Sequence, residues 1–307
     1  MRAFGHFFLI AVMSAASLPA QNATDPAATV VLNAAREALG GEKKLAAVKT
    51  IVATGRTRQV RGENLVPIEF EIAIELPDKY VRKDEIPAQE SEPTTVGFNG
   101  SALIQLPEPA AGGPPQRAGA PAPTPAQLET ARTTRLSTVK QDFARLALGM
   151  FAGSFSSFPL TFSYVAKAEA PQGKADVLEV KGPANFSARL FVNADTHLPI
   201  MVSWVPPAPP QRGGRPGGPG GADAGRGGPP GRGAPPPPPG QSAAPGRGPA
   251  SPPPETRIYY ADYRDVNGMQ FPFRLRRAVG ADTVEETTFD AFKINGKIDP
   301  KRFEVKR

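Results

Sequence analysis

The segment from Ile68 to Leu76 alternates strictly between apolar and other residues. Ile68, Phe70, Ile72, Ile74 and Leu76 occupy every second position, and Glu69, Glu71, Ala73 and Glu75 stand between them. Successive side chains of a strand point to opposite faces, so this pattern predicts a strand with one buried face and one solvent-exposed face. Strands of that kind are typical of antiparallel sheets.

Shorter patterns of the same kind recur along the chain. Further strands are expected over 50–58, 80–84, 95–98, 102–106, 160–164, 177–180, 190–192, 198–205, 258–262, 270–277 and 283–294. Asn99-Gly100 and Asn267-Gly268 are tight-hairpin signals between neighbouring segments. The sequence therefore predicts a mainly β chain with some helix (α+β), built on an antiparallel sheet.

Two helices are expected beside these strands. Asp25 and Pro26 suit an N-cap and a first helical position, and Gly40-Gly41 ends the apolar face that follows. A short helical turn is expected over 45–48. Thr124, Pro125 and Gln127 form a capping box that opens a helix to Met150, with Gly149 and Gly153 marking its end. Its apolar stripe is Leu136, Val139, Phe143, Leu146 and Met150.

The first residues predict export. Arg2 precedes the uncharged apolar run Phe7–Ala16, and Leu18-Pro19-Ala20 offers a cut before Gln21. This order is typical of a secretory signal peptide over residues 1–20. We expect a periplasmic or secreted protein, or an anchored one if the signal is not cleaved. The chain has no cysteine, which excludes disulfides and thiol chemistry.

Proline and glycine are concentrated in two stretches. The chain holds 37 Pro and 31 Gly, most of them within 107–123 and 206–254. Such segments bury too little apolar surface to offset their chain entropy, so both are expected to be disordered insertions. Residues 21–307 are otherwise expected to form a single β domain, to which the segment from Glu255 contributes the closing strands.

Several local patterns carry a family resemblance. They are Ile72–Tyr80, Val96–Ile104, Phe191–Pro199, Tyr260–Gly268, Phe271-Pro272, and Ile298-Asp299-Pro300 with Phe303. In this order the chain resembles the LolA/LolB-like superfamily of periplasmic lipoprotein carriers and lipid-binding proteins. The resemblance implies a half-open β-barrel covered by helices, and a lipid or an acylated protein as partner.

Candidates for catalysis are weak. His197 is the sole histidine after the predicted signal and lies in a turn pattern, where a structural role is expected. The carboxylate pairs Glu69/Glu71 and Glu285/Glu286 lack a pattern that predicts burial. The sequence predicts no catalytic residue, no metal site and no cofactor.

The apolar faces are the candidate binding surface. They comprise Ile68, Phe70, Ile72, Ile74, Leu136, Val139, Phe143, Phe162, Tyr164, Leu190, Val192, Ile200, Val202, Trp204, Phe271 and Phe273. Either these residues form a closed core or they line a cavity for an acyl chain. The first hypothesis is a non-enzymatic lipid- or lipoprotein-binding carrier or sensor.

The alternative is a cell-envelope interaction module that acts through the Pro/Gly/Arg-rich loop. That loop carries Arg212, Arg215, Arg226 and Arg232. In an exported protein its expected partner is an anionic envelope surface, and nucleic acid is not expected.

Overall fold

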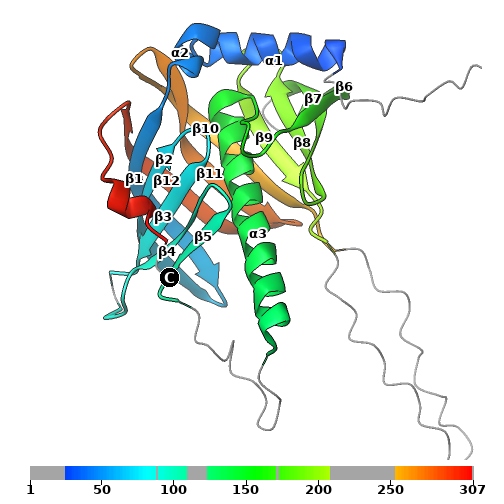
Figure 1. The fold of residues 1–307 in the computed structure, drawn as a ribbon. Helices are drawn as coiled ribbons and strands as arrows, with labels where there is room; N and C mark the ends of the chain where they lie inside the picture. Colours follow the sequence, from blue (N-terminus) through cyan, green and yellow to red (C-terminus); the bar gives the residue numbers. More distant parts are fainter. Residues whose placement is uncertain (1–24, 88, 109–122, 171–172, 208–252, 306–307) are drawn as a thin grey trace, which may run out of the picture.

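The computed structural model describes residues 25–87, 89–108, 123–170, 173–207 and 253–305. The predicted signal peptide and most of the two predicted insertions lie outside these ranges. Within them the chain is a curved antiparallel sheet with helices on its concave side and across one end (Figure 1). The expected fold class, α+β on a curved antiparallel sheet covered by helices, is confirmed.

The sheet has twelve strands in the order β5-β4-β3-β2-β1-β12-β11-β10-β9-β8-β7-β6. They are β1 (Thr50–Arg61), β2 (Asn64–Glu75), β3 (Lys79–Glu85), β4 (Thr94–Asn99), β5 (Ala102–Leu106), β6 (Thr161–Ala170), β7 (Gly173–Gly182), β8 (Phe186–Asn193), β9 (Pro199–Trp204), β10 (Thr256–Val266), β11 (Met269–Val279) and β12 (Asp282–Ile294). Sheet neighbours are also sequence neighbours except where β1 pairs with β12, so the first and last strands meet inside the sheet.

The C-terminal strands belong to this same sheet. β10 pairs with β9, and Thr256 lies opposite Trp204. Residues 206–254 therefore leave and rejoin the sheet between two adjacent strands. A long insertion at such a place costs little, because loop-closure entropy grows slowly with length.

Four helical segments accompany the sheet. They are α1 (Pro26–Ala38), α2 (Glu42–Ala46), α3 (Pro125–Phe151) and the 3₁₀ turn η1 (Pro300–Phe303). The Asp25 side chain caps α1, and Thr124 and Gln127 form the expected capping box of α3. Within the described ranges no helix is both long enough and apolar enough to cross a membrane.

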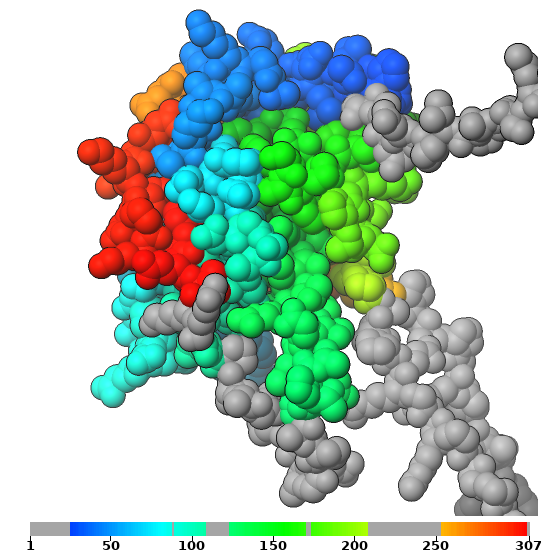
Figure 2. Space-filling model, in the orientation of Figure 1, coloured from blue at the N-terminus to red at the C-terminus, as the bar shows by residue number. Residues whose placement is uncertain are grey.

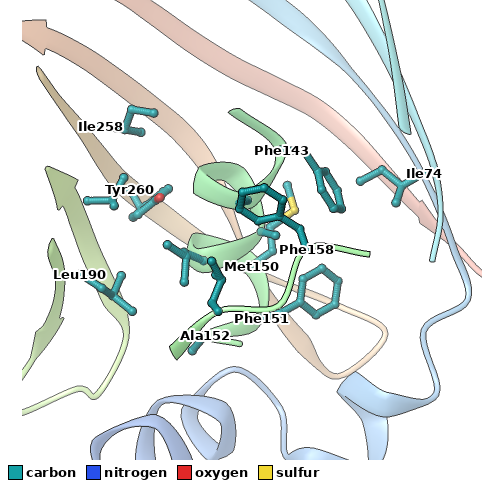
Figure 3. Close-up of a cluster of buried hydrophobic side chains, with 14 of the residues drawn as sticks. Ile74, Phe143, Met150, Phe151, Ala152, Phe158, Leu190, Ile258 and Tyr260 are labelled. Carbon is teal, nitrogen blue, oxygen red and sulfur yellow. The ribbon is translucent and has the colours of Figure 1, made fainter. Parts of the chain in front are cut away.

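Helix α3 fills the concave side with its second half. Phe143 packs against Tyr80 and Phe98, with ring centroids 5.2 and 5.6 Å apart. Figure 3 shows Phe143, Met150 and Phe151 between Ile74 on one side and Leu190 and Tyr260 on the other. Residues 125–135 are instead exposed, and this first half of α3 extends beyond the body of the protein (Figures 1 and 2).

Helix α3 ends between Gly149 and Gly153, as the sequence predicts, and Gly149 itself lies in the last turn. The helix continues to Phe151 and ends at Ala152, which has a left-handed φ of 44°. A Cβ on Gly149 would overlap the buried ring of Tyr260, so this position is occupied by glycine to allow close packing.

The outer face of β2 is also less exposed than its alternation predicts. Ala73 is 1% exposed and packs with Val81, Ile104 and Phe303 in a second cluster. The turn η1 covers this part of the sheet, where the Arg302 guanidinium pairs with Glu71 at 2.7 Å. A small residue such as Ala73, on a face that alternation predicts to be solvent-exposed, can therefore indicate that another segment of the chain packs over that face.

Replacing Gly149 with alanine tests this packing. Alanine normally stabilises a helix interior by up to about 1 kcal/mol relative to glycine. Here we expect Gly149→Ala to lower the free energy of unfolding by about 1–3 kcal/mol, because the new methyl group overlaps Tyr260. Urea unfolding measures the change.

Gly153→Ala is the matched control, since a Cβ there meets only the Phe151 carbonyl oxygen, at 3.4 Å. Equal stability of the two variants would contradict the packing role of Gly149.

Candidate ligand-binding site

The structure gathers most of the predicted apolar residues on the concave side, in one cluster that we call the concave core. From the predicted set it contains Phe70, Ile72, Ile74, Val139, Phe143, Phe162, Leu190, Val192, Val202, Phe271 and Phe273. Leu136, Tyr164 and Trp204 are partly buried and pack against it. Ile68 and Ile200 are buried outside this cluster.

Two tyrosines of β10 hold α3 on the concave core. The Tyr260 hydroxyl donates to the Arg145 carbonyl at 2.5 Å, and the Tyr263 hydroxyl lies 2.8 Å from the Gly149 carbonyl and 2.9 Å from that of Pro199. Burial raises the pKa of both phenols, so both hydroxyls remain donors at neutral pH. Gln141 adds a hydrogen bond from its amide to the Ala184 carbonyl at 3.0 Å.

Arg145 is a charged contact between α3 and the sheet. It is 6% exposed and pairs with Asp142 at 2.9 Å. Its guanidinium lies over the rings of Trp204 and Phe186, 4.1 and 5.2 Å from their centroids. Burial lowers the pKa of the Arg145 guanidinium and Asp142 opposes this shift. The Nε atom is shielded from solvent and has no hydrogen-bond partner among the described residues.

A cavity of about 80 Å³, the polar cavity, lies between α3 and the sheet. It is lined by Ile72, Tyr80, Arg82, Asp142, Leu146, Ile258, Leu275, Arg277, Glu285, Thr287 and Phe289. The sequence reasoning predicted only Ile72 of this set as a site residue. The available signal was strand parity, because Arg82 has the same parity as Tyr80, and Arg277 the same parity as Leu275 and Phe273, so each pair or triple points to one face of the sheet.

Arg82, one of the residues that line this cavity, is held by side chains of β1, β2 and its own strand β3. Its Nε donates to Asp84 at 2.7 Å, and a terminal nitrogen donates to the Thr57 hydroxyl at 3.1 Å. Thr57 also hydrogen-bonds Thr287 at 2.9 Å, and the Arg82 guanidinium lies 4.6 Å from the Phe70 ring centroid. The concave face is thus apolar over one part and polar over another.

A larger space of about 620 Å³ lies beside β5 and the exposed half of α3. Its lining is Ser101, Ala102, Leu103, Glu108, Glu129, Arg132, Thr133, Leu136 and Val305. Of the predicted site residues it includes Leu136 alone, so it is separate from the rest of the predicted apolar surface.

The residues considered as catalytic candidates, His197 and the two carboxylate pairs, do not lie together in one site. His197 is exposed in the β8–β9 turn, where its φ is 58° and its backbone N–H donates to Asn193. Glu71 pairs with Arg302 on the outer face, whereas Glu285 lines the polar cavity. Among the described residues no group of three or more His, Asp or Glu side chains is placed to hold a metal ion.

Comparisons with known proteins give structural likenesses only. No family model matches the chain, and no curated protein matches it. A LolA superfamily protein from Nitrosomonas europaea is similar at 12% identity and a TM-score of 0.47, over 90% of this chain and 97% of that one.

Two further solved structures are similar to the same degree. A putative outer membrane lipoprotein-sorting protein domain from Vibrio parahaemolyticus has 8% identity and a TM-score of 0.44, over 90% of this chain and 97% of that one. A DUF1329 family protein from Desulfovibrio piger has 7% identity and a TM-score of 0.43, over 92% and 98%. At such identities no site residue can be carried over from them.

Truncating Arg145 tests its role in docking α3. We expect Arg145→Ala to lower the free energy of unfolding by about 1–3 kcal/mol, because it uncovers Trp204 and leaves Asp142 unpaired. Trp204 is the single tryptophan, so its emission should shift as well. Arg132→Ala on the exposed half of α3 is the control, and an unchanged emission in Arg145→Ala would contradict the contact.

Proposed function

We infer that the chain is an exported binding protein, and not an enzyme, that takes the acyl chain of a lipid or acylated protein onto its concave face. The observation that carries this inference is an extended apolar part of the concave sheet face covered by one helix, of which only the second half is docked. Helix α3 is then a movable cover. The expectation of export rests on the N-terminal sequence.

Ligand entry requires α3 to move. Pockets for small-molecule ligands measure about 300–1,000 Å³, whereas the polar cavity beneath α3 measures about 80 Å³. Displacing the helix would uncover Ile74, Tyr80 and Phe98, which now pack against Phe143 or beside it. An acyl chain could replace those helix side chains at about 0.8 kcal/mol per buried CH₂, or roughly 8 kcal/mol for ten.

The polar contacts that hold α3 are few enough for a ligand to overcome. Tyr260, Tyr263 and Gln141 supply hydrogen bonds worth about 1 kcal/mol each. Their sum is smaller than the transfer free energy of a long acyl chain. The same tyrosines do not suit acid–base chemistry, because burial raises the pKa of Tyr260 and Tyr263 away from the neutral range.

Weakening these hydrogen bonds should strengthen ligand binding. In the double variant Tyr260→Phe/Tyr263→Phe each lost hydroxyl favours the open state by about 1 kcal/mol, so the affinity for cis-parinaric acid should rise by about thirtyfold. The fluorescence of this fatty acid on titration measures the affinity.

Tyr259→Phe is the matched control, since Tyr259 lies under Arg276 and makes no hydrogen bond to α3 among the described residues. Binding that is the same in all three proteins would contradict the gating role of α3. No binding by any of them would contradict the proposed function.

The interaction-module alternative draws support from one observation. Because β9 and β10 are adjacent, the last described residues before the segment 208–252 and the first after it adjoin the same pair of strands, and the segment could be presented to a partner from there. Replacing 208–252 with a short glycine-asparagine turn should leave both the far-UV circular dichroism and the binding of cis-parinaric acid unchanged. If the replacement abolishes adsorption to phosphatidylglycerol vesicles and the intact chain binds no fatty acid, the alternative is correct.

A further inference from the structure

The polar cavity adjoins the concave core. Ile72, Ile258 and Phe289 belong to both, so an apolar wall leads from the core directly to the charged side chains. Arg82, Arg277, Glu285 and Asp142 line the same cavity. One continuous surface beneath α3 therefore changes from apolar to charged, as the two ends of an amphiphile do.

Most of the charges around this cavity already have partners. Arg82 pairs with Asp84 at 2.7 Å, and Asp142 pairs with Arg145 at 2.9 Å. Glu285 is a weak acceptor for the Thr287 hydroxyl at 3.4 Å. Arg277 and Glu285 are opposed in the register of β11 and β12, yet no ion pair joins them among the described residues.

Arg277 carries N–H donors that exceed the acceptors around it among the described residues. Its Nε is shielded from solvent without a partner among the described residues, and a guanidinium carries several N–H groups but no acceptor. Tyr80, whose buried phenol has a raised pKa, is a further donor at the cavity. Unsatisfied donors in a shielded position favour an acceptor-rich anion, and planar guanidinium groups bind carboxylates and phosphates in a bidentate manner.

We propose that the polar cavity is the headgroup subsite for an anionic single-chain amphiphile, such as a fatty acid or a lysophospholipid with a terminal phosphate. Arg277 binds the carboxylate or phosphate, and the acyl chain lies along the concave core. This assignment rests on the proposed function and adds the charge of the ligand to it. The Glu285 carboxylate, which faces Arg277 across β11 and β12 with no ion pair between them in the described part of the chain, opposes the binding of an anion by like-charge repulsion.

The test compares two probes that differ only in the head. The full-length exported protein is titrated with cis-parinaric acid and with its methyl ester. We expect the acid to bind at least about tenfold more tightly than the ester, since a charged hydrogen bond is worth about 1.5–3 kcal/mol. Arg277→Gln should reduce acid binding to the level of the ester and leave ester binding unchanged.

Two further variants separate this effect from damage to the fold. Arg274 lies on the same strand but is exposed, so Arg274→Gln should leave the affinities for both probes unchanged. Glu285→Gln should strengthen acid binding severalfold, because it removes a negative charge that faces the bound anion. A gain for the acid that the ester does not share cannot arise from loosening of α3, because loosening would favour both probes.

The possible outcomes are distinct. Equal binding of acid and ester, unaffected by Arg277→Gln, would overturn the headgroup subsite and leave the acyl-binding function standing. If neither the acid nor the ester binds, the proposed function itself is overturned. Displacement of the acid by millimolar inorganic phosphate, with no binding of the ester, would indicate a site for a free anion and would also overturn the proposal.

Discussion

The contact between Gly149 of α3 and the ring of Tyr260 on β10 determines how closely the helix approaches the sheet. Any side chain at position 149 would meet that ring. The close approach brings the Tyr260 hydroxyl to the Arg145 carbonyl and the Tyr263 hydroxyl to the Gly149 carbonyl. It also places the Arg145 guanidinium over Trp204. The other contacts of the helix that covers the concave core, such as that of Arg145 with Trp204, therefore depend on one glycine and two tyrosines.

The sheet supplies a rigid frame around this cover. Because β1 pairs with β12, the first and last strands are joined well inside the sheet, and β5 and β6 are left as its edges. At the β6 edge, Asp25 both accepts a hydrogen bond from the Tyr164 backbone N–H and donates its own N–H to the Phe162 carbonyl. The cap of α1 therefore covers part of an edge that would otherwise be open to pairing with other chains. Movement of α3 breaks none of these bonds.

The sequence predicted the sheet better than the site. Alternation at Ile68–Ile74 identified the buried face of β2, and Thr124 with Gln127 identified the start of α3, because both signals are local. The packing role of Gly149 was not predicted, because its partner Tyr260 is far away in sequence. Arg82 and Arg277 were missed because inward-facing positions were expected to be apolar. Their significance depends on α3 and on neighbouring strands, and no single segment encodes that arrangement.

In the part of the chain that the structure describes, the arrangement with α3 docked on the sheet leaves hydrogen-bond donors of two arginines unpaired. Arg145 and Arg277 each keep a shielded Nε without a partner among the described residues, at a cost of about 1–3 kcal/mol for each donor. Apolar side chains of similar volume in such places are often neutral or stabilising. The two arginines therefore reduce the advantage of the closed state, and a ligand that satisfies Arg277 recovers part of that free energy only when it is bound. An anionic amphiphile would thus gain affinity from the polar part of the face and from the apolar part at once, which a neutral apolar molecule cannot do.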